Sequence, residues 1–169
     1  MQIAAEDDAL TLGGVMIAER HSPADDESRR LLRKAAQGCR FFISQVIYQP
    51  EPMQRLLHDY AQACRAQGTR PRRIILTFAP CGRPQTLAFL KWLGVAIAPT
   101  TATRILDDPA PFTRSIRICA ANLRALLDQG YAEQIPLGIN IESVSIQRDE
   151  IAASLELVHA LRDVANAYI

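Results

Sequence analysis

Four short apolar segments, each followed by residues at helical spacing, limit the fold of this chain more than any other feature of its sequence. β-branched and aromatic residues concentrate in these segments, which are too short between turn signals to form helices. A strand followed by a helix, repeated four times, predicts parallel strands joined by right-handed crossovers, with helices covering the sheet. The predicted fold class is therefore α/β. The expected strands span residues 10–17, 41–48, 74–78 and 137–144.

Prolines, glycines and capping residues delimit the expected helices. Ser22 and Pro23 open a helix over 24–37, and Gly38 ends it because glycine accepts the left-handed conformation. Residues 95–111 contain several prolines and threonines, which predict a loop with room for one short extended or helical turn. The other helices open at Pro50 and Pro52 and end before Gly68, span 83–93, run from about Phe112 to Gly130, and follow the apolar residues Ile151, Leu155, Val158 and Leu161.

Length and composition allow one sizeable core and give no sign of a charged partner. The chain has 169 residues, of which 49% are hydrophobic, so we expect a single α/β domain over 1–169 with a polar leader at 1–9. A net charge of +1 favours neither nucleic acid nor an anionic membrane surface. No apolar run approaches the roughly 18 residues that span a bilayer, and an acidic start at 6–8 is atypical of a signal peptide. We therefore expect a cytoplasmic protein.

The cysteines and histidines form no pattern typical of a metal site. Four widely spaced cysteines without a CxxC pair predict neither a zinc site nor a disulfide framework. Cys81, beside Gly82 in a predicted loop, is the one thiol whose reactivity is of interest. His58 and His159 fall on predicted helices and are expected at the surface. The spacing assembles no Ser-His-Asp triad, and no metal is predicted.

Polar residues follow the expected strands at their carboxyl ends, where parallel sheets and barrels bind ligands. Four strands suit either a small open sheet or half of an eight-stranded barrel, since a complete barrel needs about 250 residues. A half barrel leaves two outer strands unpaired, and such edges favour pairing with another chain. We therefore expect a homodimer or a second chain that supplies an N-terminal half barrel. The polar residues are Glu19 and His21, Gln45, Thr77 and Cys81, and Glu142 and Ser143.

Several stretches resemble the methylenetetrahydrofolate reductase family. They are Gly-Val-Met-Ile-Ala-Glu-Arg-His at 14–21, Asp-Glu at 26–27 through Lys34, Gly-Cys-Arg-Phe-Phe-Ile-Ser-Gln at 38–45 and Asn-Ile-Glu-Ser-Val-Ser at 140–145. The resemblance runs from about Leu12 to about Arg162 and implies strands five to eight of that family's (β/α)8 TIM barrel, a partial barrel. The run Thr-Leu-x-Phe-Leu-x-Trp-Leu-Gly-Val at 86–95 is closer to a divergent branch whose members can lack the usual flavin features.

The resemblance implies an oxidoreductase of folate and one-carbon metabolism, in the branch that serves methionine biosynthesis. The family reduces 5,10-methylenetetrahydrofolate to 5-methyltetrahydrofolate with NADH or NADPH, ordinarily through bound FAD. By position, Gln45 would hydrogen-bond the pterin ring of the folate substrate, because an amide offers both a donor and an acceptor. Arg148 is a candidate for the folate's glutamate tail, since guanidinium matches carboxylate geometry. Glu19 and His21 would contact the flavin, and Lys34 would lie near the cofactor phosphates.

The acidic residues with which this family activates the pterin lie on earlier strands and have no counterpart in this chain. Glu142, where the family often has an aromatic residue, is the candidate catalytic carboxylate. Ile17 replaces an aromatic residue that often packs near the flavin in relatives, which weakens the case for FAD. We expect reductase activity of a completed barrel and little or none of the isolated chain. Two alternatives stay open: a non-catalytic half barrel that binds folate or a nucleotide, and an open-sheet domain unrelated to folate.

Overall fold

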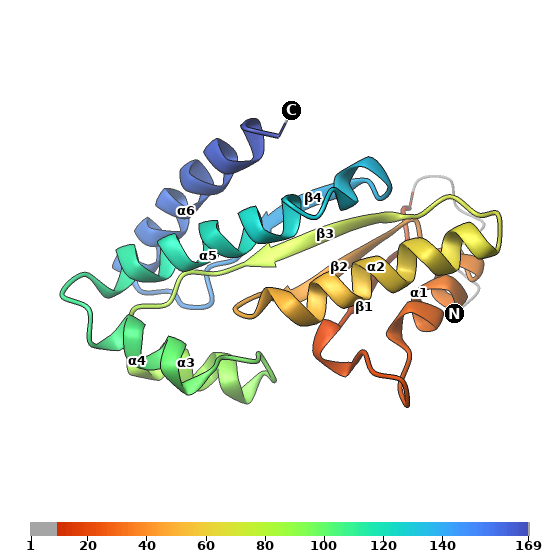
Figure 1. The fold of residues 1–169 in the computed structure, drawn as a ribbon. Coiled ribbons are helices and arrows are strands. Elements are labelled where there is room, and N and C mark those ends of the chain that lie inside the picture. The colour runs from red at the N-terminus through yellow and green to blue at the C-terminus, as the bar shows by residue number, and fades with distance from the viewer. Residues whose placement is uncertain (1–9, 169) are drawn as a thin grey trace. The chain divides into compact units, whose positions relative to one another are not determined.

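The computed structural model describes residues 10–168 and contains a four-stranded sheet with the order β1-β2-β3-β4 (Figure 1). The polar leader expected at 1–9 lies outside the described residues. β1 pairs in parallel with β2, with Gly13 opposite Phe41 and Met16 opposite Ser44. Each strand's neighbour in the sheet is its neighbour in sequence, and helices connect them, so the α/β prediction is confirmed and the sheet is consistent with a partial barrel. The strands are β1 (Gly13–Met16), β2 (Phe41–Val46), β3 (Arg73–Phe78) and β4 (Leu137–Ile141).

Six α-helices lie between and after the strands in the described part of the chain. Pro99 and Pro111, which suggested a loop, each occupy the first turn of a helix, where a missing N–H costs nothing. The prediction of a loop over 95–111 is therefore wrong, because α4 occupies its centre and buries Ala102 and Ile105. None of these helices is long and apolar enough to cross a bilayer, as far as the chain is described. The helices are α1 (Glu27–Ala36), α2 (Pro50–Ala66), α3 (Pro84–Trp92), α4 (Pro99–Leu106), α5 (Pro111–Leu127) and α6 (Arg148–Asn166), with 3₁₀ turns η2 (Ala18–Arg20) and η3 (Tyr131–Glu133).

α1 begins three residues later than its sequence signals indicate. Ser22 does not cap it, since its hydroxyl accepts the Asp25 N–H within a turn, at 3.1 Å. Asp26 is the N-cap instead, and its carboxylate accepts the Arg29 N–H at 3.2 Å. The turn that Ser22 forms holds the chain between β1 and α1, so the polar residues after β1 lie on an ordered connection.

The chain forms two compact units, each assembled from separate segments. The first takes residues up to Gln45 together with Glu51–Leu76 and Gly130–Ile139. The second takes Val46–Pro50, Thr77–Gln129 and the residues from Asn140 onward. β2, β3 and β4 each pass from the first unit into the second, so their carboxyl ends belong to the second unit. A single folding domain over 1–169 remains a prediction.

Each unit has its own apolar core. In the first, the rings of Phe42 and Tyr60 meet edge to face at 6.2 Å, beside fully buried Leu31 and Leu56. In the second, α5 and α6 pack side by side (Figure 1). Their facing sides supply the buried residues Cys119, Leu123, Leu126, Leu157 and Leu161.

The two outer strands are more exposed than the two inner ones. β1 alternates exposed and covered positions, and the Val15 side chain is 58% exposed. No residue of β4 is fully buried. β1 and β4 each have one neighbouring strand among the described residues, and both are less buried than β2 and β3.

Candidate functional site

A row of hydrogen bonds joins the carboxyl ends of β3 and β4 in the second unit. The Asn140 side-chain amide donates to Glu142 Oε1 at 2.9 Å and to Thr77 Oγ1 at 3.4 Å. The Glu142 N–H donates to the Phe78 carbonyl at 2.9 Å, which continues the pairing of the two strands. Glu142 is exposed and Asn140 is half-buried. The row therefore presents a fixed amide and a carboxylate at the edge where parallel sheets bind ligands.

A cavity of about 420 Å³ adjoins this row in the same unit. Its wall formed by α3 consists of Gln85, Thr86 and Phe89, and residues 143–146 of the connection from β4 to α6 form the other wall. Ser143 directly follows Glu142, so the cavity begins within one residue of the exposed carboxylate. Its volume lies within the range of sites for small organic ligands, and it is open to solvent.

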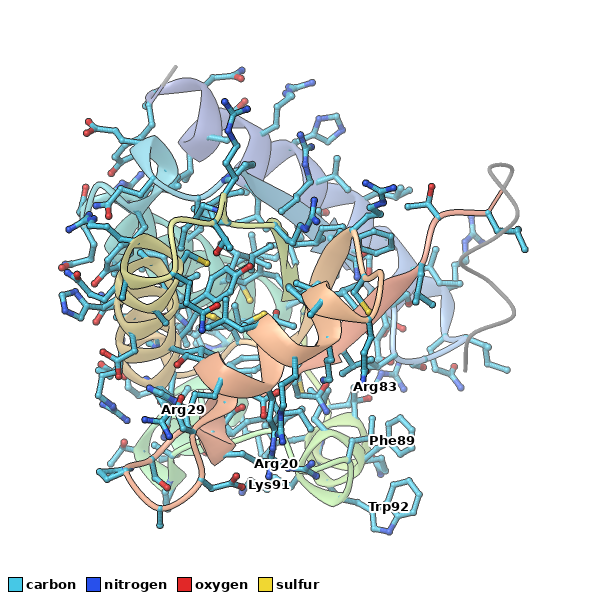
Figure 2. All side chains as sticks on the ribbon, turned by 90° about the vertical axis from the view of Figure 1, so that its right-hand side faces the viewer. Arg20, Arg29, Arg83, Phe89, Lys91 and Trp92 are labelled. Carbon is cyan, nitrogen blue, oxygen red and sulfur yellow. The ribbon has the colours of Figure 1, made fainter. Side chains whose placement is uncertain are left out.

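An exposed pair of aromatic rings stands beside the cavity on α3. Phe89 and Trp92 stack with ring centroids 5.8 Å apart and planes 21° from parallel. Figure 2 shows the two rings side by side on the outside of the helix. Trp92 is 79% exposed, which is unusual for so large an apolar side chain. Phe89 therefore offers the cavity a wall against which a flat ring can stack.

Polar contacts fix the start of α6 next to the cavity. The Thr86 hydroxyl donates to Glu150 Oε1, and Arg83 donates to Asp149. The Arg83 hydrogen bond lowers the pKa of the Asp149 carboxyl below its ordinary value. Arg148, the predicted ligand of a glutamate tail, is the first residue of α6 and is exposed. Arg148 and Glu142 thus stand at the two ends of one ordered connection.

Cys81 is not the reactive thiol that its loop position suggested. It is fully buried, its N–H donates to Ser115 Oγ at 2.8 Å, and its thiol lies 3.7 Å from the Arg83 carbonyl. Burial raises the pKa of the Cys81 thiol to about 11, and the Glu150 carboxylate adds to the effect. At neutral pH the thiol is therefore protonated and a poor nucleophile.

Gln45 lies in the first unit, one residue before the carboxyl end of β2. Its side chain is half-buried, on the face opposite the buried Ser44 and Val46, and the Ser44 hydroxyl donates to its carbonyl at 2.8 Å. Its assignment to the pterin ring stays a prediction, as does that of Arg148. His58 and His159 are exposed, as predicted.

The residues that the resemblance assigns to a flavin are engaged with the protein itself. His21 Nε2 lies 2.8 Å from Asp59 Oδ2, and its Nδ1 lies 3.7 Å from Asp26 Oδ1. Lys34 Nζ donates to the Val15 carbonyl at 2.5 Å and lies 3.9 Å from Glu27 Oε1. Lys34 thus ties α1 to β1.

FAD binding by these residues stays a prediction. Glu19 is half-buried in η2, and burial raises the pKa of its carboxyl. Asp26 and Asp59 surround His21 with further carboxylates. Arg29 and Arg30 lie 3.1 Å and 2.5 Å from the carboxylates of Asp26 and Asp25, so charges of both signs lie near His21.

Asn140 and Phe89 of this site, and Asp59 of the first unit, have contacts that the sequence did not predict. Asn140 and Glu142 are two apart at the end of a strand, a spacing that places both on one face and could have indicated their contact. Phe89 is part of the expected helix over 83–93, but helical spacing alone does not say which of its side chains are exposed. Asp59 gave no signal, because it reaches His21 from 38 residues away.

No family model matches this sequence, and no curated protein matches it. Among solved structures, the chain is similar to an uncharacterized protein from Clostridium thermocellum that binds two copies of 5-methyl-5,6,7,8-tetrahydrofolic acid. The two share 35% sequence identity and superpose with a TM-score of 0.82, over 92% of this chain and 54% of that protein. This chain therefore spans about half the length of the similar protein.

Proposed function

We propose that this chain binds a reduced folate at the carboxyl ends of β3 and β4. The observation that carries the proposal is the row Thr77–Asn140–Glu142 beside a 420 Å³ cavity, in a chain 35% identical to a protein that binds 5-methyltetrahydrofolate. That protein binds two copies, so we expect more than one folate site in the complete assembly that contains this chain.

The chemistry of the row suits a pterin ring. A pterin presents N–H donors along one edge, and the Glu142 carboxylate and the Asn140 side-chain oxygen are acceptors for them. Glu142 is exposed and accepts from Asn140 at Oε1, so its carboxylate is accessible to a ligand's donors. Phe89 supplies an apolar wall for the ligand's aromatic ring, and Arg148 supplies charge for the glutamate tail.

Calorimetric titration with 5-methyltetrahydrofolate tests the proposal. Asn140→Ala removes the donor that holds Glu142 in place, and we expect it to weaken folate binding about tenfold, which corresponds to roughly 1.4 kcal/mol. Gln129→Ala is the matched control, because it removes an exposed amide beyond the end of α5. Equal affinities for the parent and the Asn140→Ala protein would show that folate binds at a different place. Absence of binding by the parent protein would refute the proposal.

Gln45 is the second residue that we propose for the pterin, on the strength of the family resemblance. Its amide belongs to the first unit and is tested separately. Gln45→Ala and Gln45→Glu remove, respectively, the amide and its donor group. We expect both to weaken folate binding, and an unchanged affinity in both would leave Gln45 without a role in binding.

We propose reductase activity as a finer function of the completed barrel, because Glu142 places an exposed carboxylate beside the proposed pterin site. The reaction transfers a hydride from NAD(P)H to the methylene carbon of 5,10-methylenetetrahydrofolate and a proton to the nitrogen that this carbon leaves. Glu142 is the residue that we propose as the proton donor. The proposal includes no FAD.

Two measurements separate the reductase from a non-catalytic folate-binding protein. Oxidation of NADH or NADPH that depends on 5,10-methylenetetrahydrofolate supports the reductase, and Glu142→Gln is expected to slow it by at least a hundredfold. Folate binding without any NAD(P)H oxidation, in an assembly whose barrel is complete, supports the binding protein and removes the proposed role of Glu142 in catalysis.

A further inference from the structure

The two outer strands of the sheet each have one edge without a neighbouring strand among the described residues. β1 pairs only with β2, and β4 only with β3, within residues 10–168. The exposed edges also carry apolar side chains, since Val15 of β1 is 58% exposed and every residue of β4 is half-buried. Sheet edges without a neighbouring strand can serve as templates for pairing with another strand.

α6, which follows β4, has a second apolar stripe that is partly exposed. Ile151, Leu155 and Val158 are 44%, 62% and 41% exposed. Their spacing of four and three residues places them on one side of the helix, away from the buried Ala153, Leu157 and Leu161. The helix is thus apolar on two sides. A helix that packs against its own domain on one side needs only one apolar stripe, so the second stripe indicates a further contact.

We propose that a second copy of this chain covers these surfaces, so that β4 of each copy pairs with β1 of the other. A parallel sheet has two different edges, and one chain presents both, with β1 at one and β4 at the other. A twofold axis then satisfies both edges at once in a closed pair. Two sheets of four strands give eight, the number that closes a barrel around a packed interior.

The size of the similar solved protein supports a second copy as the occupant. This chain spans 54% of that protein, so two copies approximate its length. The pairing deepens the proposed function and rests on it in one respect, because a half barrel supplies only half of the carboxyl-end surface on which barrels bind ligands. In the closed pair the stripe of α6 packs against the helical layer of the other copy.

Light scattering of the purified chain measures the first consequence. We expect a mass twice the 18.7 kDa of one chain. Leu155→Glu places a charge in the stripe without removing a buried group, and we expect it to shift the mass to that of one chain. Leu93→Glu, at an exposed leucine just beyond α3, is the matched control and should remain paired. A natively folded parent protein that is monomeric at every concentration would overturn the proposal.

Engineered cysteines test which edges meet, and this test stands even where Leu155→Glu fails to fold. The four natural cysteines are buried, so an added exposed thiol reacts alone. We expect a Val15→Cys chain to form disulfides with an Ile139→Cys or Ile141→Cys chain when mixed, and not with itself. Crosslinking of Val15→Cys to itself would show that like edges pair and would overturn the proposal.

Folate titration of the monomeric Leu155→Glu variant keeps the two proposals apart. We expect its affinity for 5-methyltetrahydrofolate to fall, because the carboxyl-end surface is then incomplete. Unchanged affinity in the monomer would overturn the link between pairing and binding and leave the proposed function in place. Absence of folate binding in a paired parent protein would refute the proposed function alone.

Discussion

Asn140 shows how one side chain can organise a binding edge. Its amide reaches a hydroxyl on the neighbouring strand and a carboxylate on its own, so both are held in one orientation before any ligand arrives. Such preorganisation lowers the entropy lost on binding. Cys81 and Glu19 show the opposite effect of burial, which suppresses the charge of an acidic group instead of presenting it.

Glu19 gives a pH dependence of stability whose sign follows from its raised pKa. The raised pKa means that the folded protein favours the protonated Glu19 carboxyl. The contribution of this group to the free energy of unfolding is fully present below the pKa of the unfolded state and is lost as the pH rises through the pKa of the folded state. We expect Glu19→Gln, which mimics the protonated form, to unfold at higher urea concentration than the parent at pH 7.

The difference between the Glu19→Gln and parent proteins should shrink as the pH falls from 7 and should vanish below about 4, where Glu19 is protonated in both states. Urea denaturation at several pH values measures it. A variant that is less stable than the parent at pH 7 would mean that Glu19 makes a favourable charged contact.

At the scale of elements, most of what positions the site follows from the sequence. The apolar segments predicted all four strands, and the helical spacing predicted five of the six α-helices, because local propensity and burial agree there. α4 was not predicted, because proline occurs both in the first turn of a helix and in the loops that follow one. The exposed faces of β1, β4 and α6 were missed because periodicity identifies an apolar face but not what covers it.

Lys34 links two of these elements, and its substitution separates a structural from a cofactor role. Lys34→Met keeps the apolar stem and removes the hydrogen bond to the Val15 carbonyl. We expect faster amide hydrogen exchange in β1 and a loss of roughly 1 kcal/mol in unfolding free energy. Arg33→Met, at the exposed neighbouring position on α1, is the control and should leave exchange in β1 unchanged. Unaltered exchange in the Lys34→Met protein would argue that the contact does not hold β1.

At the scale of the whole molecule, the sequence could indicate a fragment of a barrel but not its contacts. The number of strands and the polar residues at their carboxyl ends can be read from the order of residues along the chain. The row at Asn140, the cavity beside Phe89 and the contact of His21 with Asp59 depend on which distant segments meet, and that is decided by packing. The roles of Gln45 and Arg148 in folate binding therefore stay predictions from the resemblance.

Ligand binding should raise the stability of the whole chain by mass action. At a free 5-methyltetrahydrofolate concentration one hundred times its Kd, we expect a gain of roughly 2.7 kcal/mol, or about 5–10 °C in Tm. Differential scanning calorimetry of the parent and Asn140→Ala proteins at the same folate concentration measures the effect. The variant should show a smaller rise, and an equal rise in both would contradict the proposed position of the folate.

Trp92 gives this protein a built-in optical reporter. It is the one tryptophan of the 169 residues, and it stacks on the ring that borders the cavity. Light absorbed selectively by indole therefore yields emission from a single place in the chain. Because that indole is largely in water, its emission should be red-shifted and readily quenched, and any molecule that settles against Phe89 should change it. Occupancy of the cavity can thus be followed in solution without a label.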